Sequence, residues 1–292
     1  MVALHVEPST RCTLACPKCE RTTFIDRFGK KNFAITDLDI ATFERFVDVT
    51  PDRIDLCGNS GDPIYHRDFL SLVSVAKTLA PCVKITTNGS RKTAAWWHQL
   101  CKQLDHRDLI VFSIDGTPEN FTQYRINADW PSIKTGIEVC AEYAVRTRWK
   151  YIPMSFNEHD IDDVRELSQQ LGIDHFYLYK SPRFDEDDPL MPSADLMQDT
   201  YQTQQSVRAG VNDFELDPEC GRTSMHYLSA DGYYAPCCYV KDYMHWYRSD
   251  WRRDSMHMSE YSFTQCISRF EKFYSTIHSS RPEYCVFHCG KC

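Results

Sequence analysis

The chain has 292 residues, of which 42% are hydrophobic and 25% charged, the proportions of a globular protein with one large domain or a large and a small one. Its net charge of −8 disfavours nucleic acid as a partner, because sequence-independent binding needs a basic surface, although a local basic groove is compatible with it. No apolar run approaches the roughly 18 residues of a membrane span, and no signal peptide is visible. We therefore expect a cytoplasmic protein without a membrane partner.

Short β-branched and aliphatic runs alternate with amphipathic stretches as far as about residue 180. The predicted strands are Ala3–Glu7, Arg53–Cys57, Val83–Thr87, Leu109–Ile114, Trp149–Met154 and His175–Lys180. The predicted helices are Thr36–Val47, Phe69–Leu79, Ile133–Tyr143 and Asp160–Leu171. Strands that alternate with helices favour parallel pairing, so the expected fold class is α/β, a partial (βα)6 barrel. Ligands of such folds bind at the C-terminal ends of the strands.

A boundary is expected after the last predicted strand. Ser181–Pro189 combines prolines with an acidic run, which is typical of a solvated loop, with a substrate role as the alternative. Ser193–Arg208 has a helical pattern that would close the barrel. From Phe214 onward, short aromatic segments, turns and cysteines replace the alternation. We expect a barrel over residues 1–210 and a small α+β module that binds a metal cluster over residues 211–292.

Cysteine is unusually frequent, with 14 residues in the chain. Cytosolic thiols stay reduced, so clustered cysteines in such a protein more often bind metal than form disulfides. The cysteines are also unevenly placed. Those that stand alone are expected to be small core residues: Cys57, Cys82, Cys101, Cys140 and Cys266.

Cys12, Cys16 and Cys19 have the spacing C-x3-C-x2-C directly after the first predicted strand. Three thiolates on one loop can hold three irons of a [4Fe–4S] cluster. The fourth iron then lacks a protein ligand and can bind a cofactor or substrate. The alternative is a structural zinc site, which needs four ligands where this loop offers three.

The segment from Glu7 to Cys19 resembles the signature of the radical S-adenosylmethionine superfamily. Lys18 departs from it, because an aromatic residue often precedes the third cysteine. The resemblance implies that the open iron chelates S-adenosylmethionine. One electron then cleaves the cofactor to methionine and a 5′-deoxyadenosyl radical, which removes a substrate hydrogen. It also implies an external one-electron donor such as flavodoxin or ferredoxin.

Further resemblances follow the predicted strands. Gly58–Phe69 is similar to the superfamily's Gly-Gly-Glu-Pro turn, which accepts a hydrogen bond from the methionyl amino group, with Asp62 in place of the glutamate. Ser113 matches a serine that binds the ribose or carboxylate, and Arg125 offers a bidentate partner for the carboxylate. Each motif alone is also a common turn. The cofactor-binding residues that the resemblance implies are Gly61, Asp62, Asn88, Ser113, Arg125 and Asn157.

A second group of cysteines lies near the C-terminus. Asp231-Gly232 predicts a hairpin turn between two short strands, the second of which ends near Cys237. This hairpin resembles the start of the SPASM and twitch modules of the same superfamily, which hold auxiliary [4Fe–4S] clusters. A twitch module with one auxiliary cluster fits the number of cysteines. The ligands it implies are Cys220, Cys237, Cys289 and Cys292.

Alternatives remain for this second site. Cys238 or Cys285 could replace one of the four ligands, and the same cysteines could form a zinc ribbon. Four ligands would make the cluster an electron conduit. With only three ligands, a free iron could hold substrate, as a resemblance to the molybdenum-cofactor cyclase suggests.

Three functions are compatible with the sequence. The first is hydrogen abstraction that ends in a two-electron oxidation of a small molecule through the auxiliary cluster. The second is modification of a ribosomally made peptide. Because Cys12 lies near the N-terminus, such a peptide-modifying enzyme would need a separate protein to recognise the peptide. The third is a non-enzymatic iron–sulfur or zinc scaffold, which would not need the cofactor-binding residues at the strand ends.

Overall fold

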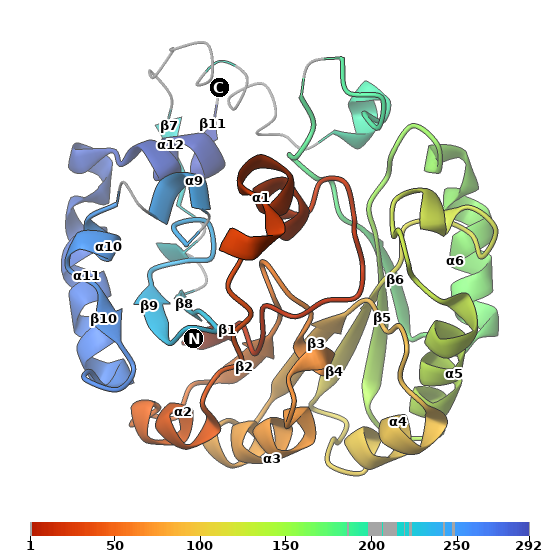
Figure 1. Ribbon diagram of the computed structural model, residues 1–292, viewed down its shortest axis with the longest axis horizontal. Coiled ribbons are helices and arrows are strands. Elements are labelled where there is room, and N and C mark those ends of the chain that lie inside the picture. Colours follow the sequence, from red (N-terminus) through yellow and green to blue (C-terminus); the bar gives the residue numbers. More distant parts are fainter. Residues whose placement is uncertain are drawn as a thin grey trace.

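The computed structural model describes the chain from residue 2 to residue 291 with short gaps. The described residues are 2–185, 187–197, 206, 215–218, 220–221, 224–241, 243–246 and 249–291. One nine-stranded sheet organises them, in the order β10-β9-β8-β1-β2-β3-β4-β5-β6 (Figure 1). Within the described part, no helix combines the length and the apolar character needed to cross a bilayer.

Six consecutive strands of this sheet are parallel, each paired with the next, which confirms the predicted α/β fold. They are β1 (Ala3–Val6), β2 (Arg53–Leu56), β3 (Val83–Thr87), β4 (Leu109–Ser113), β5 (Arg146–Tyr151) and β6 (His175–Leu178). Strand β5 begins three residues before the predicted strand and ends earlier. Its first residues alternate charged Arg146 and Arg148 with buried Thr147, and the prediction followed only the apolar run.

Five helices lie around the outside of the parallel strands (Figure 1). They are α2 (Ile40–Phe46), α3 (Phe69–Leu79), α4 (Ala94–Cys101), α5 (Trp130–Ala141) and α6 (Ile161–Gln170). Helix α1 (Glu20–Phe28) instead follows the loop that leaves β1 and lies near the centre of the view. Helix α2 is shorter than predicted because the Asp39 side chain accepts a hydrogen bond from the Thr42 amide and caps the helix there. Helices α1 and α4 were not predicted.

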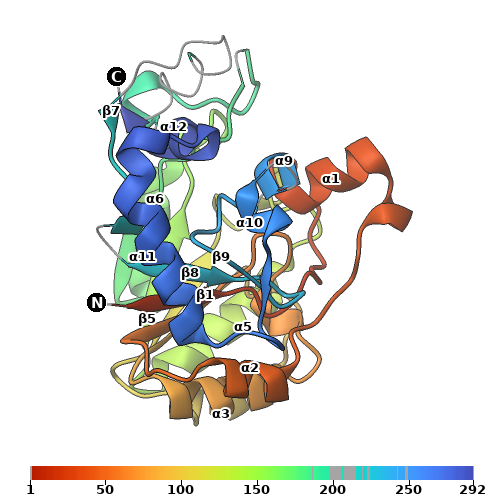
Figure 2. The same cartoon turned by 90° about the vertical axis from the view of Figure 1, so that its left-hand side faces the viewer.

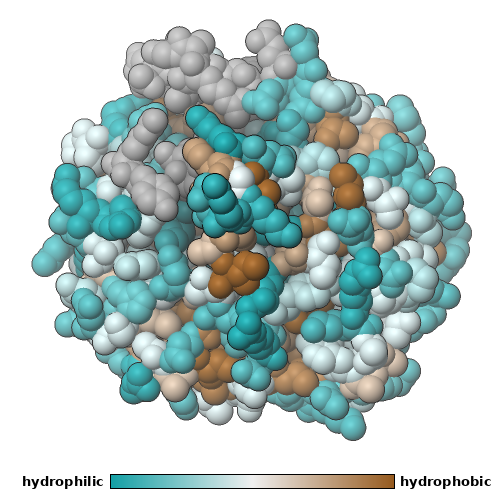
Figure 3. All heavy atoms as spheres, in the orientation of Figure 1, coloured by the Kyte–Doolittle hydropathy of each residue, from teal (hydrophilic) through white to brown (hydrophobic). Residues whose placement is uncertain are grey.

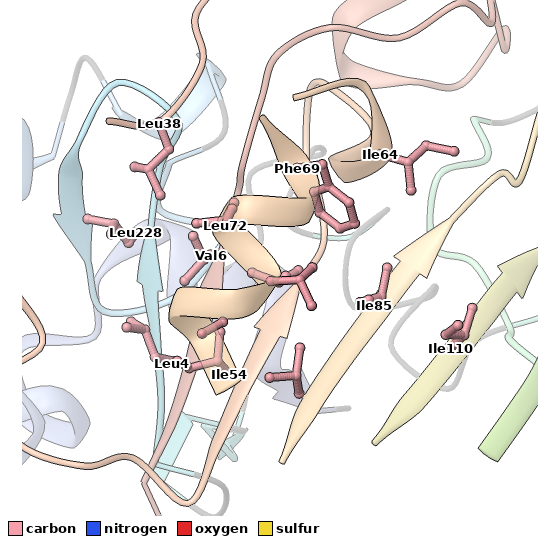
Figure 4. Close-up of a cluster of buried hydrophobic side chains, with 14 of the residues drawn as sticks. Leu4, Val6, Leu38, Ile54, Ile64, Phe69, Leu72, Ile85, Ile110 and Leu228 are labelled. Atoms are coloured by element: carbon pink, nitrogen blue, oxygen red, sulfur yellow. The ribbon is translucent and has the colours of Figure 1, made fainter. Parts of the chain in front are cut away.

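The main core lies between these helices and the sheet. Leu4 and Val6 of β1 and Ile54 of β2 are fully buried against Phe69 and Leu72 of α3 (Figure 4). Each such side chain stabilises the fold by roughly 1.5–3 kcal/mol relative to an exposed position. This packing fixes the C-terminal ends of the parallel strands, where the site is built.

The C-terminal residues continue the same sheet. Strand β8 (Met225–Leu228) pairs in parallel with β1, and β9 (Tyr233–Ala235) pairs antiparallel with β8. The hairpin predicted at Asp231-Gly232 is therefore confirmed, with Gly232 at a φ of +81°. β10 (Met256–His257) pairs with β9. The remaining elements are β7 (Glu215–Leu216), α9 (Tyr243–Trp246), α10 (Asp250–Arg253), α11 (Phe263–Ser280), α12 (Glu283–Cys289) and β11 (Gly290–Lys291).

Two predictions about the fold fall on residues that the structure does not describe. The expected boundary at residues 210 and 211 is one of them. The other is most of the helix expected over Ser193–Arg208, of which the described part contains a 3₁₀ turn, Ala194–Leu196.

Candidate active site

Cys12, Cys16 and Cys19 lie on the single loop that leaves β1. Cys16 is buried, and the other two are half-buried. Cys19 is the N-cap of α1, and its amide donates a hydrogen bond to the Cys16 carbonyl at 3.1 Å. The Cys12 sulfur accepts from the Leu14 amide at 3.4 Å and from the Asn88 side-chain nitrogen at 3.7 Å. The loop therefore presents three thiols on one side.

The three thiols line a cavity of about 270 Å³, called here the first cavity. It lies beyond the C-terminal ends of the parallel strands, where the fold rule places ligands. Five of the six predicted cofactor-binding residues line it with the cysteines: Gly61, Asp62, Asn88, Ser113 and Arg125.

The turn after β2 approaches the cysteine loop closely. A Cβ atom on Gly61 would lie 1.9 Å from the carbonyl oxygen of Ser9, so only glycine fits there. The amides of Ser60 and Gly61 donate to the buried carboxylate of Glu7, at 2.6 and 3.3 Å. Glu7 therefore holds this turn against the start of the cysteine loop, a role that the sequence analysis missed.

Asp62 binds the turn after β3. Its carboxylate accepts from the amide and the side chain of Asn88, both at 2.6 Å, and from the Thr87 hydroxyl at 2.8 Å. Burial raises the pKa of Asp62 to about 6, against these hydrogen bonds. Asp62 thus joins two of the turns that line the first cavity.

Arg125 lies against a buried carboxylate. Its Nε donates to Asp115 at 2.6 Å, and Asp115 also accepts from the Ile152 amide at 2.8 Å. Burial opposes the charge of Arg125, but Asp115 and the Cys16 thiol outweigh it and hold the pKa of Arg125 above its usual value. The guanidinium is therefore charged and fixed at the cavity wall.

Asn157 has a different place from the other predicted residues. It is fully buried and is not among the residues that line the first cavity. Its side chain accepts from the Met154 amide at 2.6 Å and donates to the carbonyls of Asp115 and Ile152 at 3.1 Å. These bonds shape the loop after β5 and support Asp115 from behind.

Several cavity residues were not predicted. Lys150 reaches in from β5, with its Nζ 3.8 Å from the centre of the Tyr179 ring, and burial lowers its pKa to about 8. Cys57, predicted as a core residue, lines the same cavity. The period-two pattern of β5 carried a signal for Lys150, because Thr147 and Trp149 alternate with it and face the core.

The C-terminal cysteines line a separate cavity of about 190 Å³, the second cavity. They come from distant segments, and Cys285 and Cys289 lie one turn apart on α12. Cys292 lies outside the described residues. The lining cysteines are Cys220, Cys237, Cys238, Cys285 and Cys289, so both residues predicted as alternative ligands are among them.

The two cavities are adjacent. Tyr179, Cys238 and Tyr239 line both of them. His5, which also lines the second cavity, makes a 2.8 Å hydrogen-bond contact from its Nε2 to the Cys57 carbonyl, next to the first cavity. A thin wall of aromatic and sulfur-containing side chains therefore separates them.

The chemistry of the thiols fits iron–sulfur ligation at both cavities. Burial raises the pKa of Cys12 to about 12 and that of Cys237 well above its usual value. A buried thiol becomes a thiolate when a metal supplies the compensating charge. Among the described cysteines none forms a disulfide, and no three His, Cys, Asp or Glu side chains in that part of the chain converge as a single-ion site requires.

Comparison with known proteins places this fold. No family model matches the chain. A Pyrococcus furiosus protein, named as the tungsten-containing aldehyde ferredoxin oxidoreductase cofactor-modifying protein, is 27% identical over 120 residues, 40% of this chain and 32% of that protein.

Solved structures match over more of the chain. Streptococcus suis SuiB bound to S-adenosylmethionine has a TM-score of 0.60 at 14% identity, covering 86% of this chain and 64% of SuiB. Native anSMEcpe with bound AdoMet and Kp18Cys peptide has a TM-score of 0.63 at 13% identity, covering 93% of this chain and 82% of anSMEcpe. BtrN in complex with AdoMet and 2-DOIA has a TM-score of 0.53 at 12% identity, covering 99% of this chain and 92% of BtrN.

The chain thus spans about a third of the Pyrococcus protein and under two thirds of SuiB. Its fold is that of these S-adenosylmethionine-bound structures, so the α/β fold that the sequence predicts is confirmed.

Proposed function

We propose that this protein is a radical S-adenosylmethionine enzyme that removes a hydrogen atom from a bound substrate. One observation carries the proposal: a three-cysteine loop and five predicted cofactor-binding residues line the same cavity at the strand ends. Each motif alone is common, but a scaffold without this chemistry gives no reason for all of them to meet there.

In the first cavity, Cys12, Cys16 and Cys19 would hold a [4Fe–4S] cluster with one open iron. Bound together, the cluster and S-adenosylmethionine supply a 5′-deoxyadenosyl radical. The protein's own part is to bind and orient. Arg125, fixed by Asp115, would pair with the methionyl carboxylate, and Ser113 would bind the ribose or that carboxylate.

The second cavity would hold one auxiliary [4Fe–4S] cluster in a C-terminal module, residues 211–292. Its proposed ligands are Cys220, Cys237, Cys289 and Cys292, with Cys238 or Cys285 able to replace one of them. Its position behind a thin wall supports a role as electron acceptor in a net two-electron oxidation, because Tyr179 and Tyr239 line both cavities.

The substrate is proposed to be a small molecule or a peptide. Two matched structures favour one class each: anSMEcpe contains a bound peptide, and BtrN contains 2-DOIA. Reduction of the first cluster is assigned to an external carrier such as flavodoxin or ferredoxin.

Anaerobic reconstitution followed by turnover tests the proposal. We expect about eight irons and eight sulfides per chain, and 5′-deoxyadenosine formed from S-adenosylmethionine under reducing conditions. With a deuterated candidate substrate, mass spectrometry should find deuterium in the 5′-deoxyadenosine. One equivalent of zinc with negligible iron, and no cofactor cleavage, would refute the enzyme and favour the scaffold.

A further inference from the structure

Helix α1 and the following 3₁₀ turn (Lys30–Asn32) form an overhang beside the first cavity, defined here as residues 20–35. None of the nine residues of α1 is buried. Figure 2 shows α1 projecting from the body of the molecule. Helices of globular proteins gain most of their stability by packing an apolar face. Of the nine residues of α1, Thr23, Asp26, Arg27 and Phe28 are exposed and the other five are half-buried.

The surface of the overhang combines apolar and basic side chains. Phe28 and Ile35 are 44% and 58% exposed, and Arg27, Lys30 and Lys31 are exposed around them. Nowhere in the described residues does a carboxylate lie within ion-pair distance of these three cations. Figure 3 shows hydrophilic atoms over α1 with a brown apolar patch next to them. Exposed aromatic and arginine side chains such as Phe28 and Arg27 are enriched in protein–protein contacts.

The local charge opposes that of the chain. Residues 20–35 carry four basic and two acidic side chains, in a protein with a net charge of −8. A groove of about 280 Å³ separates the overhang from the C-terminal residues. Its lining has mixed charge: Arg252, Lys241 paired with Asp231 at 3.1 Å, and the carboxylates of Glu7 and Glu20. The basic excess therefore lies on the overhang and not in the groove. A positive patch on an acidic protein would steer an acidic partner to this face.

The overhang begins at the first cavity itself. Cys19, one of the three loop thiols, is the N-cap of α1. Glu20, the first residue of the helix, lines both the groove and the first cavity. Electron transfer slows steeply with distance, so a carrier seated on the overhang would lie favourably close to the cysteine loop.

We propose that the overhang is the docking surface for an acidic one-electron carrier protein, with Lys30, Lys31 and Phe28 as contact residues. The inference rests on the proposed function, because it assigns the carrier's entry point to the first cavity. It adds a surface and a partner chemistry that the cavity does not itself specify.

The test uses a flavodoxin as the probe and the reconstituted chain as the receptor. The variant Lys30→Glu/Lys31→Glu reverses two charges on the overhang. The matched control Lys102→Glu/Lys134→Glu reverses two exposed charges at α4 and α5. Phe28→Ser removes apolar contact without changing charge. Calorimetry at low and high salt gives the Kd, and absorbance follows cluster reduction by reduced flavodoxin or by dithionite.

We expect Lys30→Glu/Lys31→Glu to weaken flavodoxin binding about tenfold at low salt, and less at high salt, because salt screens exposed charges. Flavodoxin-driven reduction should slow, whereas dithionite-driven reduction and iron content should match the parent. Phe28→Ser should weaken binding at both salt concentrations.

Three results would overturn the docking surface: no flavodoxin binding by the parent, equal binding by the overhang and control variants, or equal slowing with dithionite. If the overhang binds a peptide substrate instead, flavodoxin should reduce the overhang variants at the parent rate, and the proposal is wrong. If flavodoxin binds the overhang but S-adenosylmethionine is never cleaved, the docking surface stands and the proposed enzyme activity fails.

Discussion

The three proposed ligands in the first cavity come from eight consecutive residues on the loop that leaves β1. The five cysteines that line the second cavity come from the 220 region, the β9 hairpin and α12. The parallel sheet and its helices support the first loop with a large core. Cys220, Cys237 and Cys238 pack against the same main core. Cys285 and Cys289 of α12 instead belong to a small separate cluster, whose buried members among the described residues are Leu216, Ile277 and Cys285. We infer that the first site is held by the fold, whereas the second helps to hold α12 in place.

The largest expected effect comes from the first site. Cys12→Ala/Cys16→Ala/Cys19→Ala should reduce formation of 5′-deoxyadenosine to background and remove about four irons per chain. The free energy of unfolding should change by less than roughly 2 kcal/mol, because the loop lies outside the main core. Iron analysis, chromatography and urea unfolding measure the three quantities. Retained cofactor cleavage would place the open iron elsewhere.

Cys220→Ala should have the opposite effects on cofactor cleavage and on the fold. Some unproductive cleavage of S-adenosylmethionine should persist, while product formation falls and the second cluster is lost. Helix α12 should also become sensitive to protease, because its own cluster of buried residues is small and metal binding contributes folding energy there.

Cys82→Ala is the matched control for Cys220→Ala. Cys82 is half-buried and lines neither cavity, and its thiol donates to the Arg107 carbonyl at 3.1 Å. This variant should keep both clusters and its resistance to protease. If Cys220→Ala also loses the second cluster yet stays resistant, the second site does not hold α12 in place and our comparison is wrong.

The same contrast explains what the sequence could predict. The six parallel strands are short apolar runs between helical patterns, and the cysteine triad is a local spacing, so both were readable. Strand β5 was misplaced because its charged residues alternate with buried ones. Helix α1 was missed because it buries no residue, and so has no apolar stripe facing the core.

Contacts between segments that are distant in the sequence could not be predicted. No local pattern indicates that β8 joins the sheet beside β1, or that Tyr227 on β8 meets Glu7. The ligands of the second site were left with alternatives for the same reason. α12 places Cys285 and Cys289 one turn apart, and both line the cavity, so spacing alone does not separate them.

A smaller effect is expected at Arg125. Arg125→Lys keeps the charge but loses the planar pair of donors, so the Kd for S-adenosylmethionine should rise about 10- to 100-fold, in line with roughly 1.5–3 kcal/mol for a charge-assisted hydrogen bond. Equilibrium binding to the reconstituted protein measures it. Arg146→Lys, at the opposite end of the strands, is the control and should bind like the parent. Equal Kd values for the parent, Arg125→Lys and Arg146→Lys would mean that the methionyl carboxylate of S-adenosylmethionine does not bind Arg125.

The smallest effect tests the connection between the two regions. The Tyr227 hydroxyl on β8 donates to Glu7 at 3.0 Å, and the other carboxylate oxygen of Glu7 accepts from the turn at Ser60 and Gly61. Tyr227→Phe removes one of these three donors from a buried carboxylate. The free energy of unfolding should fall by about 1–3 kcal/mol at pH 7.

The pH dependence of that loss identifies Glu7 as its cause. Burial raises the pKa of Glu7 above its usual value, and the Tyr227 hydrogen bond opposes this rise. Without the hydroxyl the pKa of Glu7 should rise further, so the variant's folded state holds a proton to higher pH than the parent's. Its deficit should therefore be full above both folded pKa values and shrink as pH falls through them. Urea unfolding of both proteins from pH 8 to pH 5 measures the difference. A deficit that is constant with pH would mean that Tyr227 acts by packing alone, and that the carboxylate does not couple the C-terminal strands to the first cavity.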